Sequence, residues 1–211
     1  MTVLSVIRQF CARTNISVPT SVHGTTDVQV LQLKGLLDEE GMDLAKRGGW
    51  EALIVEAVHV TLAAEDQGRM TDIAPNGFRN IILDSFWDRT MRLEVGVVSG
   101  REWQRVKGFS TTGPRFRVRV RGGRLIVNPI PPAGNTWAFE YVSKNWLLDP
   151  NGTLYKEAST HDNDELLLPE ALVLMGLRWR WKREKGFDYA EDFATYERQV
   201  SQALGADGMK E

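Results

Sequence analysis

The segment Arg115-Phe-Arg-Val-Arg-Val-Arg-Gly-Gly-Arg-Leu-Ile-Val-Asn128 predicts a β-hairpin. Its first half alternates arginine with apolar residues, two glycines follow, and the second half returns to apolar residues. This is the pattern of two short strands joined by a two-residue loop. With that loop Val120 lies opposite Leu125 and Val118 lies opposite Val127, so one face of the hairpin is apolar.

Residues on both sides of the hairpin also favour strands. Four further segments are predicted strands: residues 54–62, 78–87, 89–98 and 136–144. They are rich in β-branched and aromatic residues, which suit a pleated sheet. A short helix is predicted at about 99–107, and it ends at Gly108.

At both ends of the chain, apolar residues recur at the spacing of a helix instead. Residues 3–11 repeat apolar side chains at helical spacing, and a second helix is predicted over about 27–47. Toward the C-terminus, helices are predicted over 169–185 and 188–204, separated by Gly186. The short joint between these last two helices predicts an antiparallel helical hairpin.

The predicted helix at 27–47 carries its apolar and acidic residues on different faces. Its apolar stripe consists of Val30, Leu33, Leu37 and Leu44. The acidic residues fall largely outside the stripe: Asp38, Glu39, Glu40 and Asp43.

These periods predict an α+β fold. Helices from residues 1–48 and 165–211 form one discontinuous helical bundle, drawn from both chain ends. Residues 49–164, which include the hairpin at 115–128, form a central antiparallel β-domain.

Composition excludes several classes of protein. The 211 residues include 26 Lys or Arg and 28 Asp or Glu, so the net charge is −2, and 42% are hydrophobic. Such a chain is neither disordered nor a wholly basic nucleic-acid binder. No apolar run approaches the roughly 20 residues of a bilayer span, so we expect no membrane partner. The single cysteine, Cys11, cannot form an internal disulfide and is predicted to lie in the core.

Motifs for catalysis or cofactor binding are missing from the sequence. His23, His59 and His161 are dispersed, and no zinc, phosphate-loop or nucleophile-elbow motif occurs. Residues 161–165 resemble a calcium loop only superficially, because the central glycine and the spaced final glutamate are missing. We therefore predict a protein that is not an enzyme and that has no catalytic residue, cofactor or metal.

Basic residues gather between positions 101 and 124, where eight Lys or Arg face one acidic residue, Glu102. Four of them project from one face of a strand, because side chains two apart point the same way: Arg115, Arg117, Arg119 and Arg121. Three interpretations stay open: a solvated edge strand, contact with an acidic surface of a neighbouring subunit, or contact with phosphate. The acidic connector at 149–170 is a natural complement, within one chain or between neighbours.

A second cluster of interface-type residues is Arg178-Trp-Arg-Trp-Lys-Arg183. Trp179 and Trp181 lie about 200° apart on a helix, so both can be buried only if the helix packs against two partners or spans an interface. Because Trp and Arg are favoured at interface hot spots, an interface role for Arg178, Trp179 and Trp181 is one interpretation. A core role for at least one of the tryptophans is the alternative.

A series of motifs resembles, in the same order, the head-to-tail adaptor proteins of short-tailed bacteriophages, of the tail-tubular-protein-A-like kind. The first two are Phe78-Arg-Asn-Ile-Ile-Leu-Asp-Ser-Phe-Trp-Asp-Arg-Thr90 and Gly100-Arg-Glu-Trp-Gln-Arg-Val-Lys107. The later ones are residues 116–129, 139–146 and 167–170, the last leading into 177–191. Together they span about residues 50 to 200. The segment 62–74 departs from the family, which often has an aromatic residue and Leu-Pro before its next strand.

The resemblance implies a structural virion protein. Such adaptors combine a helical bundle from both chain ends with a central β-domain, and they assemble, typically as dodecamers, into a ring beneath the portal. The ring provides the attachment platform for the tail nozzle. The implied partners are therefore the portal protein, the tail nozzle protein and further copies of the chain, with DNA passing through the ring without sequence-specific binding. The implied location is the virion neck, after synthesis in the host cytoplasm.

Two other classes of function remain open. A carbohydrate-binding β-module would use Trp137 or Trp146 as an exposed sugar platform. Another tail component, including a hydrolytic one, would need convergent carboxylates in a cleft.

Overall fold

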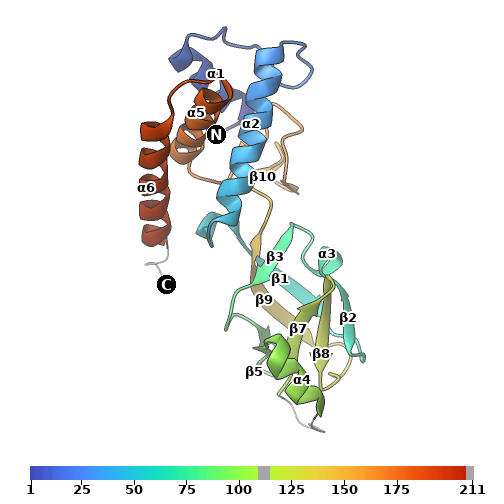
Figure 1. Cartoon of the computed structure of the whole chain (residues 1–211). Coiled ribbons are helices and arrows are strands. Elements are labelled where there is room, and N and C mark those ends of the chain that lie inside the picture. The colour runs from blue at the N-terminus through green and yellow to red at the C-terminus, as the bar shows by residue number, and fades with distance from the viewer. Residues whose placement is uncertain (109–114, 208–211) are drawn as a thin grey trace. The chain divides into compact units, whose positions relative to one another are not determined.

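The computed structural model of the chain describes residues 1–108 and 115–207 and confirms the α+β class (Figure 1). The chain forms two compact units. Met1–Leu53 and Lys144–Glu211 make up one, called the helical unit, and Ile54–Ser143 make up the other, called the β-unit.

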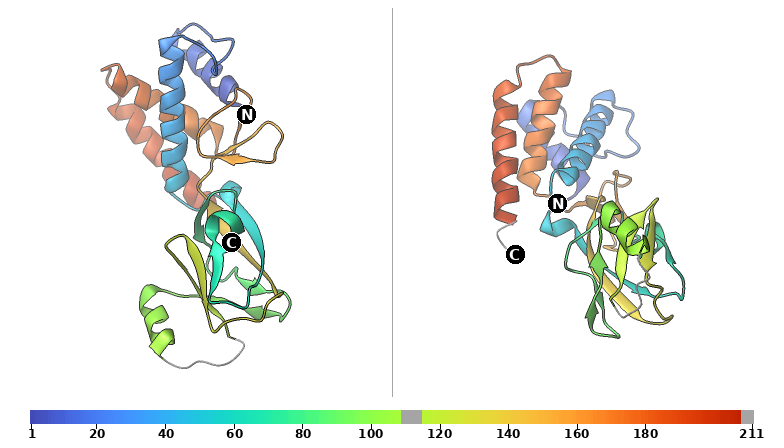
Figure 2. Two further views of the ribbon diagram at one scale, coloured as in Figure 1. Left: turned by 90° about the vertical axis from the view of Figure 1, so that its right-hand side faces the viewer. Right: turned by 60° about the horizontal axis from the view of Figure 1, so that its bottom comes forward.

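The helical unit is built from both ends of the chain. Its described helices are α1 (Val3–Thr14), α2 (Val28–Lys46), α5 (Glu170–Glu184) and α6 (Ala190–Asp207), with a 3-10 turn, η1, at Glu51–Leu53. A small antiparallel sheet has the order β11-β10-β12, formed by Tyr155–Lys156, Leu147–Leu148 and Glu165–Leu166. Helix α5 packs against α1, α2 and α6, and Figure 2 shows the helices from the two chain ends side by side.

Local chemistry starts and stops these helices close to the predicted positions. The carboxylate of Asp27 accepts the backbone N–H of Gln29 at 2.8 Å and caps the start of α2. Asp188 accepts the backbone N–H of Ala190 at 3.1 Å in the same way at the start of α6. Gly186, with φ of 72°, takes the left-handed conformation that ends α5.

Residues 144–164, which the sequence analysis placed in the β-domain, cluster with the helical unit. Trp146 is fully buried and donates its indole N–H to the carbonyl of Glu157 at 2.7 Å. Asp38 of α2 accepts the backbone N–H of Ser159 at 2.9 Å and its hydroxyl at 3.1 Å. Although Asp38 lies outside the apolar stripe of α2, its carboxylate is therefore buried, and it holds the connector on α2.

The β-unit contains two sheets. The first has the order β1-β9-β4-β5, with β3 also paired to β9. Its strands are β1 (Ile54–Val60), β9 (Thr136–Ser143), β4 (Trp87–Asp88), β5 (Leu93–Glu94) and β3 (Phe78–Ile81). The second has the order β2-β8-β7-β6, formed by Asp66–Arg69, Arg124–Asn128, Arg117–Arg121 and Gly96–Val97. The described part of this unit also contains α3 (Met70–Ile73), between β2 and β3, and α4 (Gly100–Gly108), between β6 and β7.

The predicted hairpin is β7 and β8. Val118 pairs with Val127 and Val120 pairs with Leu125, which confirms the predicted register. Gly122 and Gly123 have φ of 57° and 72°, as a tight two-residue loop requires. Strand β6 runs parallel to β7. The prediction of an antiparallel β-domain is therefore wrong for this pair of strands.

Two long predicted strands, 78–87 and 89–98, are broken into short pieces. The chain turns between β3 and β4, where Asp84 has φ of 65°. After β4 the buried carboxylate of Asp88 accepts the backbone N–H of Met91 at 2.8 Å and the indole N–H of Trp137 at 3.0 Å. This side chain bends the backbone into a turn and prevents the longer strand.

Aromatic residues fill the space between the two sheets. The ring of Phe86 lies 4.6 Å from that of Phe139 and 5.5 Å from that of Trp137, measured between centroids. The apolar face of the hairpin, with Val118 and Leu125, closes the same core. The hairpin is thus held by burial of one face, and its other face, which carries the arginines, is left outside the core.

We expect Gly41→Ala in α2 to lower the free energy of unfolding by about 1–3 kcal/mol, because a Cβ at this position would overlap the ring of Trp146. The matched control is Gly35→Ala in the same helix, where no described neighbour lies within 4 Å of the new Cβ. That variant should gain up to about 1 kcal/mol from helix propensity. Urea unfolding followed by circular dichroism measures both. Equal effects of the two substitutions would contradict the packing of Trp146 on Gly41.

Candidate interaction surfaces

The predicted row of arginines lies on the outer face of the hairpin. Arg117, Arg119 and Arg121 alternate along β7 with Val118 and Val120, whose side chains point into or against the core. Arg115 precedes the strand and is exposed, as is Arg121, whereas Arg117 and Arg119 are half-buried. The structure therefore brings the row together on one side of the strand.

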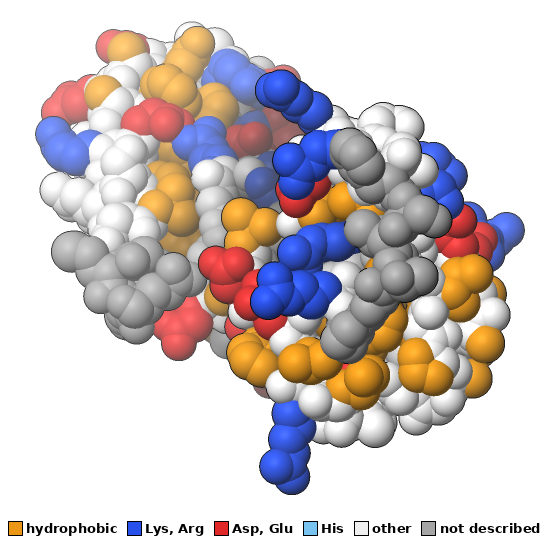
Figure 3. Space-filling view, turned by 90° about the horizontal axis from the view of Figure 1, so that it is seen from below, with side chains coloured by type: hydrophobic (Ala, Val, Ile, Leu, Met, Phe, Trp, Pro, Cys, Tyr) orange, Lys and Arg blue, Asp and Glu red, His pale blue; other side chains and the backbone are white. Residues whose placement is uncertain are grey.

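Helix α4 adjoins this face of the sheet and adds to its charge. Trp103 of α4 is buried against Val98 and Ile126, and Ile126 lies opposite Arg119 in the hairpin register. Arg101 and Arg105 on the same helix are exposed. Figure 3 shows Lys and Arg side chains gathered on the β-unit. We call this surface the basic face, and define it by Arg101, Arg105, Arg115, Arg117, Arg119 and Arg121.

The cations of the basic face are unpaired within the part of the chain that the structure describes. None of the six forms an ion pair with a described carboxylate. Nearby cations differ: Lys107 pairs with Glu65 at 2.7 Å and Arg124 pairs with Asp66 at 2.5 Å. The basic face is thus a concentration of positive charge with no neutralisation by the described residues around it.

Three carboxylates of the acidic connector form their contacts within the helical unit. Backbone amides of its own turn donate to Asp149 and lower its pKa to about 2. Burial opposes the ionisation of Asp162, but the amides of His23 and Val22 outweigh it and lower the pKa to about 2. Asp164 is fully buried and pairs with Lys156 at 2.6 Å. These three carboxylates therefore stabilise turns inside the helical unit.

The two tryptophans of α5 face different helices, as their spacing predicts. Trp179 is buried against α6, with the ring of Phe193 at 5.0 Å. Trp181 is half-buried, and its ring lies 5.8 Å from that of Phe10 in α1. Placing Trp179 at a subunit boundary needs correction, because α6 of the same chain covers its ring and gives it the core role that was the alternative. The ring of Trp181 remains partly exposed.

Arg178 is exposed, and it forms a local ion pair. Its Nε atom lies 3.3 Å from Asp192 of α6, and Lys182 pairs with the same carboxylate. An exposed pair of this kind contributes little to stability because solvent screens it. Arg178 therefore remains available for contact with another surface.

Sequence analysis missed the most buried cation of the helical unit, Arg180. Its side chain contacts three carboxylates of α2: Glu40 at 2.7 Å, Asp43 at 2.9 Å, and Glu39. Glu40 is fully buried and also accepts the hydroxyl of Tyr196 in α6 at 2.5 Å. Although Glu40 lies outside the apolar stripe of α2, its carboxylate joins three helices.

The network controls the ionisation of its buried carboxylate. Burial raises the pKa of Glu40, and the hydrogen bonds from Tyr196 and Arg180 partly offset the rise. Burial also raises the pKa of the Tyr196 hydroxyl, as does the neighbouring charge of Glu40. Gly176 of α5 leaves the space that the carboxylate of Glu40 occupies, since a Cβ there would overlap it. A sequence signal exists in retrospect: three acidic residues of α2, Glu39, Glu40 and Asp43, lie within little more than one helical turn.

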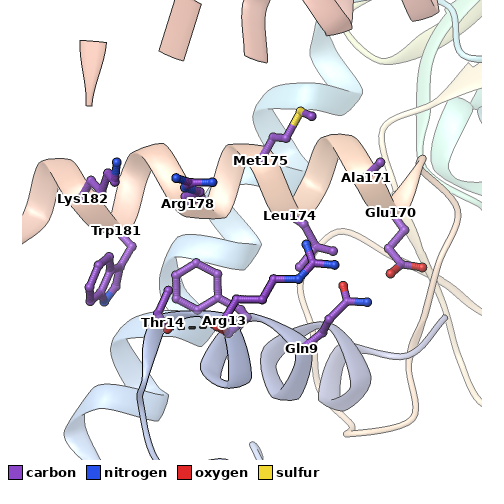
Figure 4. A pocket seen from close by; sticks show the side chains of 11 residues that line it. Gln9, Arg13, Thr14, Glu170, Ala171, Leu174, Met175, Arg178, Trp181 and Lys182 are labelled. Carbon is purple, nitrogen blue, oxygen red and sulfur yellow. Dashed lines mark hydrogen bonds between the residues drawn. The ribbon is translucent and has the colours of Figure 1, made fainter. Parts of the chain in front are cut away.

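A groove of about 720 Å³ runs between α1 and α5 (Figure 4). Its apolar lining includes Phe10 and Leu174, which are buried, and the half-buried Trp181. Gln9 and Arg13 line it from α1. Figure 4 shows Glu170 at one end of the α5 side and Lys182 at the other. The groove is therefore a concavity with an apolar floor and charged residues at its margins.

The β-unit also exposes apolar side chains on a sheet face. Val58 of β1 and Trp87 of β4 both lie beside Ala138 of β9 in the strand register, and both are exposed. Val60 extends the patch along β1. Trp87 lines a shallow hollow that also includes the paired side chains of Arg89 and Glu56. An exposed apolar patch with a central Trp is typical of a protein contact.

The described residues, 1–108 and 115–207, hold no cluster of His, Cys, Asp and Glu that could bind a metal ion. His59 lies 3.3 Å from the side-chain oxygen of Gln67, and burial lowers its pKa. Cys11 is buried, as predicted. Asp164 is buried too, whereas His161, Asn163 and Glu165 around it are exposed.

Two further expectations concern sugar binding and the membrane. Trp137 and Trp146 are both fully buried, so neither ring is available as a sugar platform. Among the described helices, none has the length and apolar character needed to cross a bilayer.

Comparison with known proteins finds one family. The model of the family described as SU10 adaptor protein matches residues 1–210. No curated protein sequence matches the chain. The family match therefore spans both the helical unit and the β-unit.

We expect Arg180→Met to lower the free energy of unfolding by about 3–5 kcal/mol, because Glu40 is left as a buried, uncompensated charge. Adding Glu40→Gln should restore part of this loss, since the neutral amide still accepts the Tyr196 hydroxyl. Urea unfolding measures both variants.

The loss in Arg180→Met should also depend on pH. Without the cation, burial raises the pKa of Glu40 in the folded state further above its unfolded value. A raised carboxyl pKa favours folding at low pH, and this contribution is lost as pH rises through the folded pKa. The single variant should therefore be less destabilised at pH 5 than at pH 8, and the double variant should lose that difference. A single variant equally destabilised at both values would contradict the role assigned to Glu40.

Proposed function

The chain belongs to the SU10 adaptor protein family, and from this premise we propose that it is the head-to-tail adaptor of a bacteriophage virion. The family is one of phage structural adaptors rather than of enzymes. In the proposed role, copies of the chain form a ring beneath the portal, and the ring provides the platform to which the tail nozzle attaches. The family match over both units is the observation that carries this proposal.

The proposal names partners and a place. The partners are the portal protein, the tail nozzle protein and further copies of this chain, in a ring of about the dodecameric size implied by the resemblance. DNA passes through the ring without sequence-specific binding. The assembly belongs to the virion neck, and its subunits are made in the host cytoplasm. The closer likeness to tail tubular protein A is part of the same proposal.

The surfaces of the chain support an assembling role. A closed ring needs heterologous contacts, in which one patch meets a different patch on the neighbour. The chain offers patches of different chemistry: the basic face, the apolar patch around Trp87, and the groove between α1 and α5. We assign the portal side to the helical unit and the tail side to the β-unit.

The basic face supports a contact with an acidic protein surface. We assign Arg115, Arg117, Arg119 and Arg121 to a neighbouring subunit or to the nozzle protein. The main carboxylates of the acidic connector have partners of their own, so the complement is better sought elsewhere on the assembly. In the helical unit, Arg178 and Trp181 keep their place in the proposed boundary, whereas Trp179 is a core residue.

Electron microscopy of the purified chain mixed with the portal protein of its own genome tests the proposed function. We expect portal-capped rings of the adaptor, with added density after the nozzle protein is supplied. A carbohydrate-binding module would instead bind glycans as a monomer. A chain that stays separate from the portal at micromolar concentrations would contradict the proposal.

Reversal of exposed charge on the basic face tests that assignment. Arg115→Glu combined with Arg121→Glu should weaken assembly about tenfold or more at moderate salt, because a complementary contact becomes repulsive. The matched control is Arg69→Glu with Arg198→Glu, which changes the net charge equally at exposed positions outside the basic face. Analytical ultracentrifugation with the portal and with the nozzle protein measures the effect. Equal assembly of the two double variants would remove the basic face from the interface.

A further inference from the structure

Helix α5 is the central helix of the helical unit, and one strip of it lines the groove between α1 and α5. Its other sides pack against α1, α2 and α6. This strip consists of Ala171, Met175, Arg178 and Lys182. Ala171 and Arg178 are exposed and the other two are half-buried, and Arg178 and Lys182 also reach Asp192 of α6. The strip's spacing of four, three and four residues keeps its side chains on one line along the helix, which is the repeat that receives a further helix.

The side chains around this strip lack partners. The side-chain oxygen of Gln9 is buried and has no hydrogen-bond partner among the described residues. Arg13 is exposed and, within residues 1–108 and 115–207, forms no ion pair. Figure 4 shows both side chains between α1 and α5, on the side of Glu170 and Leu174. The groove thus combines an apolar lining, an unused acceptor and an unpaired cation.

The start of α2 forms a ridge, in contrast to the groove between α1 and α5. Val28 is 77% exposed, more than any other large apolar side chain described, and Leu31 is 47% exposed. With Gly35 they form a ridge of residues spaced by three and four. At about 100° per residue, this ridge points roughly 180° away from the buried stripe of Leu33 and Leu37. Because it faces away from its own bundle, the ridge cannot reach the groove of its own chain.

Ridge and groove match in length and chemistry. Val28 to Gly35 and Ala171 to Arg178 are each seven residue steps apart, or about 10 Å along the helix axis. The apolar ridge suits the apolar lining. Gly35 lets a neighbouring backbone approach closely, because the space that a Cβ would occupy there has no described neighbour within 4 Å. Asp27, the exposed residue before the ridge, supplies a carboxylate for Arg13.

We infer that the first two turns of α2 in one copy dock into the groove between α1 and α5 of the next copy. The occupant of the groove is therefore a second copy of this chain. The contact is heterologous, since ridge and groove are different surfaces, and repetition of it around an axis closes a ring. This inference rests on the proposed ring and names the contact that joins its subunits.

Thiol crosslinking in the portal-bound assembly tests the inference. Leu31→Cys places a thiol on the ridge and Ala171→Cys places one in the groove, while the single natural cysteine, Cys11, is buried. With a short bismaleimide, a mixture of the two variants should give a heterodimer, and each variant alone should give none. A chain carrying both substitutions should give a ladder of oligomers.

The matched control replaces the groove thiol with Ala194→Cys, an exposed position on α6. Thiols held in contact react as if at millimolar local concentration, so the Leu31–Ala171 pair should crosslink about tenfold more than the Leu31–Ala194 pair. Rings without this preference overturn the inference and leave the adaptor function standing. A link from Ala171→Cys to the portal protein overturns it as well, since the portal then fills the groove. Absence of any ring with wild-type chain overturns the proposed function itself.

Discussion

The buried guanidinium of Arg180 is the constraint on which the helical unit depends. A cation removed from water needs carboxylates at hydrogen-bonding distance, and α2 supplies them at Glu40 and Asp43. Tyr196 of α6 binds the far side of the Glu40 carboxylate. Three helices drawn from residues at both chain ends are therefore held in one register, because a shift of any helix would leave a charge buried without its partner.

That register determines what α5 presents to its neighbours. With Arg180 directed at α2, Trp179 must lie against α6 and Trp181 must lie against α1. The side of α5 that carries Met175 and Arg178 becomes the wall of the groove. The open surface of the helical unit is thus a consequence of where its buried charge is neutralised.

Sequence predicts the parts of this structure that local patterns control. The hairpin register follows from two glycines and alternation, and the helix at Asp27 follows from its cap. The burial of Glu40 could not be predicted from the apolar period alone, because a period counts a charged residue as exposed. Its partner Arg180 is 140 residues away. The same limit explains the connector: Trp146 and Asp38 bind it to α2 through contacts that no local pattern encodes.

The two units use charge in opposite ways, so their open surfaces make contacts through different physical interactions. The helical unit engages Asp149, Asp162 and Asp164 in its own turns and Glu40 in its core, so the groove it leaves open is largely apolar. The β-unit buries an aromatic core and leaves a row of arginines without an ion pair among the described residues. A net charge of −2 hides this separation. Contacts through the basic face must weaken as salt screens them, whereas contacts through the groove depend on apolar burial and should persist at high salt.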